Sequence, residues 1–228
     1  MSSVCITFDV DWATDDALQY LIDKLTKHNI KASFFATHDT KVLTSINSNL
    51  FEVGIHPNFN DSNGDFITPI QNLMEIYPNA IGGRSHSLFC SSNILQTYEA
   101  FGLKYESNIF LPFHDNLKVT KRRKNLVSIP FFWSDDYCLD NYLLDVDFPA
   151  LIDNESGLKV FNFHPIHIFA NTPSNDFYEK IRPHYHNSEK LIQLRNNSTI
   201  GICDLFDQLL NFITKCSITP KLMSENIQ

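Results

Sequence analysis

The run Val-Cys-Ile-Thr-Phe-Asp-Val-Asp-Trp at residues 4–12 decides how this sequence is interpreted. Its first half is apolar and rich in β-branched residues, which is typical of a buried strand. Side chains alternate between the two faces of a strand, so we expect Asp9 and Asp11 to point the same way. Two carboxylates on one face repel each other, and a bound cation would offset that cost. The pair alone leaves open whether it binds a metal, acts in catalysis or only caps the following helix.

The segments that follow alternate between helical and strand patterns. Apolar residues recur at helical spacing over residues 15–28, and residues 31–37 form an apolar run typical of a strand. This β-α-β order predicts an α/β fold with parallel strands. Further strands are expected at residues 51–56, 80–86, 103–110, 127–133 and 159–163, and further helices at 40–50, 68–77, 91–101, 177–182 and 202–216.

The composition is that of a globular protein. Of the 228 residues, 43% are hydrophobic and 19% are charged, so we expect one domain over residues 1–228. The net charge of −8 argues against a nucleic-acid partner, because general nucleic-acid binders need a basic footprint. The sequence gives no indication of the oligomeric state.

Two patterns bear on the compartment. The chain opens on a strand, and no run reaches the roughly 18 apolar residues of a membrane span, so we expect neither a signal peptide nor a membrane segment. The cysteines are odd in number and form no Cys-x-x-Cys, which argues against a disulfide framework or a thiolate zinc site. A cytoplasmic location is therefore expected.

Residues able to do chemistry recur at the carboxyl ends of the predicted strands. They are Asp9 and Asp11, His56, Arg84 and His86, Asp135 and Asp136, and His164 and His167. Active sites of parallel α/β folds and barrels lie at that edge of the sheet. A single histidine at a strand end is more often structural, but five strand ends in agreement predict an active site there.

Asp11 and His56 are the first candidate metal ligands. Either Asn60 or His86 could complete a set of three and leave positions open for water and substrate. Asn60 is a weak neutral ligand and also suits a turn, so it would bind zinc less tightly than a second histidine would. Pro165 restricts the backbone of His164 towards an extended conformation, and a rigidly held imidazole near a metal could act as a general acid.

The order of these motifs resembles the polysaccharide deacetylase superfamily, in a divergent branch of cytosolic type. The first motif, Thr-Phe-Asp-x-Asp, matches residues 7–11, and the His-x-x-x-His motif matches His56 with Asn60 in its second place. The Arg-x-Pro motif matches Arg84, with His86 in place of proline. The late Leu-x-His motif matches Asn162 and His164.

The resemblance implies a distorted (β/α) barrel, often with seven strands, and a hydrolase that uses a divalent metal to remove an acyl group. Zinc is the metal it implies first, with Mn²⁺, Co²⁺ or Ni²⁺ as alternatives. Carried over by position, Asp9 would be the general base, Asp11 and His56 metal ligands, and His164 the general acid, while Arg84 would orient Asp9 or bind substrate. The expected substrate is a saccharide or a related small amide, with N-acetyl as the expected acyl group.

Two other functions fit parts of the pattern. Asp9-Val-Asp11 also resembles the Asp-x-Asp of haloacid-dehalogenase-type phosphatases, in which Asp9 would be the nucleophile and magnesium the metal. Asp135 and Asp136 would then form the late acidic motif. The asparagine at position 60 suggests a third possibility, a protein that keeps the deacetylase fold and binds a ligand without turnover.

Overall fold

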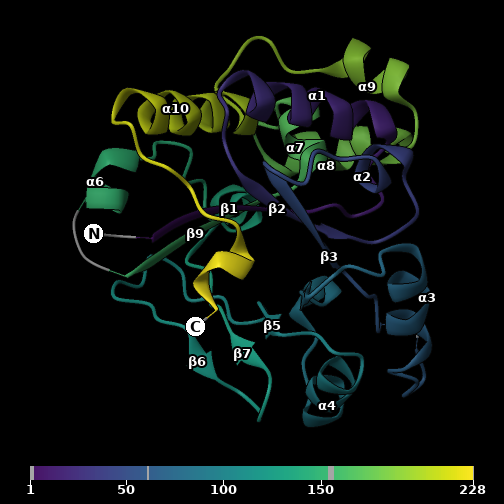
Figure 1. Cartoon of the computed structure of the whole chain (residues 1–228). Helices are drawn as coiled ribbons and strands as arrows, with labels where there is room; N and C mark the ends of the chain where they lie inside the picture. The colour runs from purple at the N-terminus through teal and green to yellow at the C-terminus, as the bar shows by residue number, and fades with distance from the viewer. Residues whose placement is uncertain (1–2, 61, 154–156, 228) are drawn as a thin grey trace.

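The protein is described by a computed structural model that covers residues 3–60, 62–153 and 157–227. Its centre is a curled sheet (Figure 1). The strands are β1 (Ser3–Asp9), β2 (Ala32–Ala36), β3 (Phe51–Ile55), β4 (Gly82–Gly83), β5 (Tyr105–Glu106), β6 (Thr120–Lys121), β7 (Val127–Ser128), β8 (Trp133–Ser134) and β9 (Leu158–Phe163). They lie in the order β6-β7-β5-β4-β3-β2-β1-β9-β8, and only the β6–β7 pair is antiparallel.

The α/β fold expected from the sequence is confirmed, and the sheet forms a distorted barrel. Nine strands are assigned within the described residues, whereas seven were expected. β7 and β8 belong to one run at residues 127–134, and β6 is a short edge strand. When β7 and β8 are taken together and β6 is left out, seven parallel segments remain. A parallel bridge between Phe110 and Phe131 links the segment after β5 to the segment before β8, so the sheet curls back towards its own edge.

The helices are α1 (Asp15–Lys27), α2 (Lys41–Thr44), α3 (Thr68–Ile76), α4 (Ser92–Ala100), α5 (Asp135–Asp140), α6 (Phe148–Asp153), α7 (Pro165–Ala170), α8 (Asn175–Ile181), α9 (Ser188–Leu194) and α10 (Ile202–Lys215). The 3₁₀ turns are η1 (His86–Leu88), η2 (Arg182–His184) and η3 (Met223–Asn226). In Figure 1, α1, α7 and α10 gather on one side of the sheet, whereas α3 and α4 lie beside β3 and β5. None of the described helices is long and apolar enough to span a bilayer.

The main core lies between the sheet and the helices α1, α7 and α10. The helix predicted over residues 202–216 is confirmed as α10, and one face of it is buried: Leu205, Phe206, Leu209, Leu210 and Ile213. Phe206 packs edge-on against Phe8 of β1 and Phe163 of β9, with ring centroids 5.8 and 5.1 Å away. Edge-to-face packing of this kind fixes the helix on the sheet and adds to the hydrophobic gain. β1 and β9, which carry the candidate site, are thereby held rigidly.

The segment that follows β9 has the predicted extended residue and, in addition, a helix that was not predicted. Pro165 favours an extended His164, and His164 is indeed extended, with φ −110° and ψ 127°. However, a helix, α7, begins at Pro165 itself, because proline suits the first turn of a helix as well as it restricts the residue before it. Helix α2 spans only residues 41–44, where a helix over 40–50 was expected. The short helices α5, α6 and α9 were not predicted.

Candidate active site

Asp9 is held at the end of β1 by two buried donors. Arg84 Nη1 donates to Asp9 Oδ1 over 2.9 Å, and Asn162 Nδ2 donates to Asp9 Oδ2 over 3.0 Å. Arg84 also donates through Nε and Nη2 to the backbone and hydroxyl oxygens of Ser107, at 2.9 and 2.8 Å. Each oxygen of Asp9 therefore has a fixed partner, which sets the orientation of the carboxylate.

The guanidinium of Arg84 is fully buried between two aromatic rings. Its central carbon lies 4.5 Å from the ring centroid of Phe35 and 4.4 Å from that of Phe131. A planar cation between ring faces gains cation–π attraction, while its N–H groups stay free to donate in the plane. Arg84 therefore contacts Asp9 directly, in a geometry compatible with orienting it, the first of the two roles suggested by the sequence.

Asp11 is directed by a turn rather than by strand alternation. β1 ends at Asp9, and both Asp11 and Trp12 have left-handed backbones, with φ values of 43° and 58°. The Trp12 N–H donates to Thr37 Oγ1 over 2.9 Å, which helps to hold this unusual conformation. Asp9 and Asp11 do face the same cavity, as expected, but strand alternation is the wrong explanation, because the strand ends at Asp9. The turn brings Asp11 towards the strand ends that carry His56 and His86.

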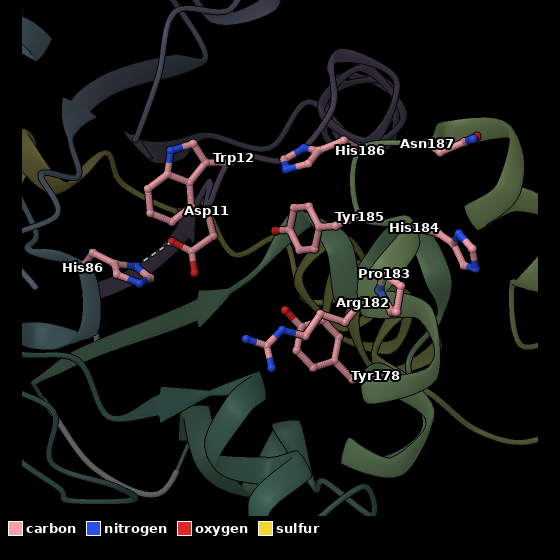
Figure 2. A pocket seen from close by; sticks show the side chains of 10 residues that line it. All are labelled: Asp11, Trp12, His86, Tyr178, Arg182, Pro183, His184, Tyr185, His186 and Asn187. Atoms are coloured by element: carbon pink, nitrogen blue, oxygen red, sulfur yellow. Dashed lines mark hydrogen bonds and ion pairs between the residues drawn. The ribbon is translucent and has the colours of Figure 1, made fainter. Parts of the chain in front are cut away.

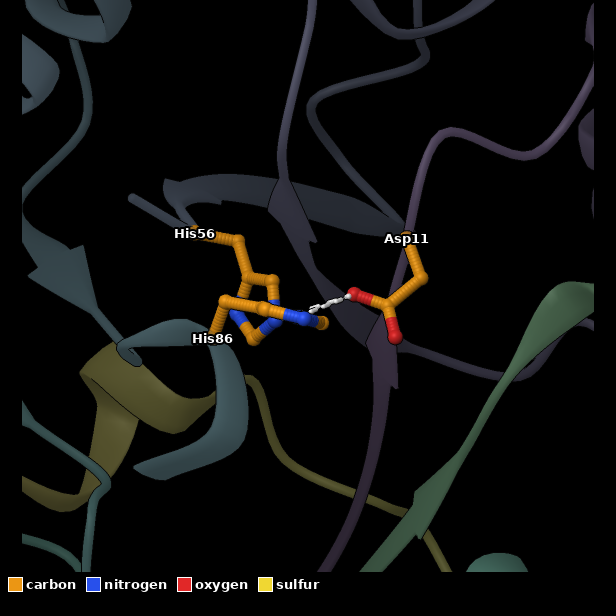
Figure 3. Close-up of side chains that lie close together, drawn as sticks. All are labelled: Asp11, His56 and His86. Atoms are coloured by element: carbon orange, nitrogen blue, oxygen red, sulfur yellow. Dashed lines mark hydrogen bonds and ion pairs between the residues drawn. The ribbon is translucent and has the colours of Figure 1, made fainter. Parts of the chain in front are cut away.

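His56 and His86 both direct a ring nitrogen at the Asp11 carboxylate. His56 Nε2 lies 3.2 Å and His86 Nδ1 lies 3.0 Å from Asp11 Oδ1 (Figure 3). The backbone N–H of His56 donates to Ala36 over 2.7 Å, which extends the β2–β3 ladder by one residue. Burial alone would raise the pKa of Asp11, but its hydrogen bonds with both imidazoles hold that pKa well below the usual value. The hydrogen bond to Asp11 in turn raises the pKa of His86.

These three side chains are a suitable donor set for a divalent metal. One ligand atom from each of Asp11, His56 and His86 lies within 4.8 Å of the others. Two imidazoles and one carboxylate are ligands that zinc and similar transition metals accept. The two imidazoles crowd a single carboxylate, an arrangement that a shared cation would stabilise.

The structure keeps Asn60 apart from this set. Asn60 is exposed, and its side-chain nitrogen lies 3.5 Å from Ser87 Oγ. Its backbone N–H donates to Asn58 Oδ1 over 2.9 Å, which is the turn role that the sequence also allowed. Asn60 lines neither of the two cavities that Asp11 lines. Of the two candidates for the third ligand, only His86 contacts Asp11.

His164 is positioned by a carboxylate that follows β8. Asp135 Oδ2 accepts from the His164 backbone N–H over 2.6 Å, and Asp135 Oδ1 lies 2.7 Å from His164 Nδ1. Because a carboxylate only accepts, Nδ1 carries the proton of this hydrogen bond, and Nε2 is left to face the site. Nε2 lies 3.7 Å from Asp11 Oδ2 and 4.0 Å from Asp9 Oδ2. Burial opposes protonation of His164, yet the carboxylates of Asp136, Asp135 and Asp11 raise its pKa well above the usual value.

Two cavities meet at Asp11 and His86. The smaller, of about 390 Å³, is lined by Asp9, His56, Asn162 and His164 together with the aromatic residues Phe110, Phe131 and Tyr137. The larger, of about 790 Å³, extends past Trp12 to residues 178 and 182–187 (Figure 2). His184 and His186 also line this larger cavity. The metal-binding candidates therefore lie where both cavities open.

Comparison with known proteins identifies the family. The model of the WbmS-like polysaccharide deacetylases matches residues 6–182. The chain belongs to this family. WbmS of Bordetella bronchiseptica, described as a polysaccharide deacetylase involved in O-antigen biosynthesis, has a crystal structure that is 33% identical to this chain. The match covers 92% of this chain and 90% of WbmS, with a TM-score of 0.84. No curated protein matches the chain in sequence.

Two more distant structures share the fold alone with this WbmS-like chain. A polysaccharide deacetylase of Mycobacterium smegmatis is 18% identical, with a TM-score of 0.52 and coverage of 96% of this chain and 92% of its own. The 4-α-glucanotransferase of Thermococcus litoralis is 11% identical, with a TM-score of 0.59, and the match covers 99% of this chain but 38% of the larger enzyme.

Membership of the WbmS-like family confirms the resemblance to polysaccharide deacetylases and supports a hydrolase that deacetylates a sugar. It favours neither the phosphatase nor the binding protein without turnover. The structure also adds residues whose roles the sequence did not assign. Asn162 stands where the family motif has leucine, and it bonds Asp9. The sequence suggested Asp135 only as a strand-end acid and, in the phosphatase alternative, as part of the late acidic motif. Its role depends on a contact with His164, 29 positions away, which no local pattern reveals.

A second histidine–aspartate group lies beside His164 in this WbmS-like site. His167 Nε2 lies 3.0 Å from Asp136 Oδ1, and His164 Nε2 lies 3.5 Å from Asp136 Oδ2. The positive imidazoles of His164 and His167 hold the pKa of Asp136 below its usual value. The negative charge of Asp136 therefore helps to keep His164 protonated.

Proposed function

We propose that this chain is a metal-dependent deacetylase that hydrolyses an acyl group, most simply N-acetyl, from a saccharide. The observation that carries the proposal is the contact of Asp11 with both His56 and His86, directly beside the buried Asp9–Arg84 pair. A metal-binding set and a fixed carboxylate at one cavity are the two requirements of metal-assisted hydrolysis.

Asp11, His56 and His86 would hold the metal, with zinc as the first choice and Mn²⁺, Co²⁺ or Ni²⁺ as alternatives for the same donor set. When bound, such an ion supplies Lewis-acid polarisation of the acyl carbonyl and lowers the pKa of water. We take His86 rather than Asn60 as the third ligand, because His86 contacts Asp11 and Asn60 is exposed.

Asp9 accepts the proton of the attacking water. Arg84 and Asn162 each occupy one lone-pair direction of its oxygens, so the carboxylate cannot rotate away from the cavity that it lines. A general base held in a fixed orientation loses little entropy when the transition state forms. Arg84 acts here as a positioning residue.

His164 donates a proton to the leaving nitrogen of the amide. Asp135 holds its Nδ1, so the Nε2 that faces Asp9 and Asp11 is the atom that transfers the proton. Asp9 and His164 approach the site from the ends of the neighbouring strands β1 and β9, and His164 Nε2 lies 4.0 Å from Asp9 Oδ2. The stacked Phe110 and Phe131 rings and the adjacent Tyr137 offer apolar surface to a sugar ring.

We propose carbohydrate metabolism in the cytoplasm as the setting. All five cysteines are free, and two of them, Cys90 and Cys216, are exposed. Exposed free thiols are typical of a reducing compartment.

Acetate release from N-acetylated saccharides tests the proposed function. Protein stripped of metal and reloaded with zinc should release acetate and a free amine in equal amounts, whereas the stripped protein should not. Asp9→Asn should lower the rate by about 10²- to 10⁴-fold with unchanged metal content, the usual range for a general base. Asp16→Asn, an exposed acid in the first turn of α1, is the matched control. Equal rates for Asp9→Asn and Asp16→Asn would exclude the mechanism.

A further inference from the structure

The larger cavity has one wall that the deacylation mechanism does not use. Residues Tyr178, Arg182 and Tyr185 come from α8, η2 and the turn that follows. In Figure 2 their polar ends point into the cavity, towards the side that carries Asp11 and His86. Trp12 lies on the opposite side and packs edge-on against His86, with the two ring centroids 5.1 Å apart. A ligand in this cavity would thus lie between hydrogen-bond donors and the edge of the metal-binding set.

The lining of this cavity is poor in acidic residues, although the chain as a whole is acidic. The chain has a net charge of −8, yet Asp11 is the only acidic residue among the described residues that line the cavity. The same lining contains Arg182, His184 and His186 on the far wall. Because Asp11 belongs to the proposed metal-binding set, a bound cation would cancel its charge, and the remaining lining would attract anions.

Arg182 is available to a ligand. Its Nη1 contacts Glu179 at 3.2 Å, but both side chains are more than 60% exposed. Exposed pairs one turn apart contribute little, so a second anion can share or replace Glu179. The contact engages Nη1 alone, and a guanidinium offers five N–H donors in a planar fork that suits carboxylate and phosphate oxygens.

Tyr185 provides an independent observation. Its hydroxyl oxygen is buried and has no hydrogen-bond partner among the described residues, although the ring lines the cavity beside Asp11. Buried polar atoms without partners are rare, and each one in a native structure requires an explanation. An oxygen atom of a ligand in the cavity would complete this hydrogen bond.

We propose that the wall formed by Tyr178, Arg182 and Tyr185 binds an anionic group of the substrate, so that the substrate is an acidic saccharide carrying a carboxylate or a phosphate. This inference rests on the proposed function, because it assigns the substrate class of the same site. Asp11 and His86 line both cavities. One substrate can therefore place its acyl group near Asp9 and His164 in the smaller cavity and its anionic group against Arg182 in the larger one.

Isothermal titration of the full chain, loaded with zinc, tests the inference. The probes are N-acetylglucosamine 1-phosphate for the phosphate source, glucuronic acid for the carboxylate source, and neutral N-acetylglucosamine as reference. At least one acidic probe should bind about tenfold tighter than the neutral one, as one charge-assisted hydrogen bond provides. Arg182→Gln should remove that preference, and Tyr185→Phe should weaken binding of the preferred acidic probe.

Lys180→Gln is the matched control, because Lys180 is an exposed cation of α8, two positions before Arg182, that does not line the cavity. It should bind all probes like the wild type, and the metal content of every variant should be equal. Failure of both acidic probes to bind better than the neutral one overturns the inference. So does an Arg182→Gln variant that keeps the wild-type preference, since the zinc ion alone would then account for anion binding.

The two proposals fail in different ways. If acetate is released from neutral saccharides while no acidic probe is preferred, the proposed anion-binding role of this wall is wrong and the proposed deacetylase function stands. If the preference for acidic probes depends on Arg182 but no N-acetylated substrate releases acetate, the anion-binding role of the wall stands and the proposed function is wrong.

Discussion

Arg84 Nη1 lies 2.9 Å from Asp9 Oδ1, and the two side chains are 0% and 7% exposed. An ion pair this deep in the protein has lost nearly all of its hydration, so each charge depends on the other. Arg84 also donates to Thr7 Oγ1, to Asn162 Oδ1 and to two oxygens of Ser107. The pair therefore connects the proposed proton acceptor to the barrel interior, and its removal should affect both folding and activity.

Arg84→Met should destabilise the fold by about 3–5 kcal/mol, because it leaves Asp9 buried without its cation. Urea denaturation followed by circular dichroism measures this change. Arg84→Lys keeps a charge but loses the planar guanidinium that reaches Asp9 and Ser107 together. Its stability should therefore lie between that of Arg84→Met and that of the wild type. A Met variant as stable as the wild type would show that the pair contributes nothing to folding.

Asp135→Asn should abolish most of the activity without loss of metal. Asp135 accepts from both the backbone N–H and the Nδ1–H of His164. An asparagine has one acceptor oxygen and one NH₂ group, so one of these two N–H groups would face another donor and lose its hydrogen bond. The imidazole would then be displaced or adopt the other tautomer. We expect kcat to fall by about 10²- to 10⁴-fold with little change in KM, as for loss of general-acid catalysis. If KM rises and kcat does not change, Asp135 acts on substrate binding instead.

Gly82→Ala should destabilise the protein through one close contact. A Cβ atom at Gly82 would lie 1.9 Å from the Tyr105 ring, which is buried and donates to Glu52 over 3.1 Å. Overpacking of this kind costs about 1–3 kcal/mol. The same substitution in a Tyr105→Ala background should cost less, and a double-mutant cycle measures the difference. If Gly82→Ala lowers the stability equally in both backgrounds, the strain does not come from the contact with Tyr105.

Much of the fold could be predicted because its strong elements carry clear periodic patterns. The helix at residues 15–27 has Thr14 as its N-cap, acids in its first turn and lysines in its last, and it forms as predicted. β1, β2, β3 and β9 also form close to their expected bounds. Strand β5 covers only residues 105–106 of the predicted 103–110, because the barrel curls there and regular pairing gives way to single bridges. That the chain is one domain stays a prediction.

The site was predictable in its members and less so in its geometry. The strand-end rule collected Asp9, Asp11, His56, Arg84 and His164 without any structure, and these residues do meet at one edge of the sheet. The rule could not choose between Asn60 and His86, because the choice depends on where the η1 turn places His86. The left-handed turn at Asp11 and Trp12 was also not visible, since aspartate adopts this conformation in only a small share of cases and a bulky residue such as tryptophan does so rarely.

Bound metal in purified variants tests the central claim most directly. The protein, stripped and reloaded with zinc, is dialysed and its metal measured by mass spectrometry for the wild type, His86→Ala and Asn60→Ala. If Asp11, His56 and His86 hold the ion, the wild type and Asn60→Ala will retain one equivalent per chain and His86→Ala will lose most of it. Loss of the metal from Asn60→Ala, with full retention by His86→Ala, would contradict this assignment.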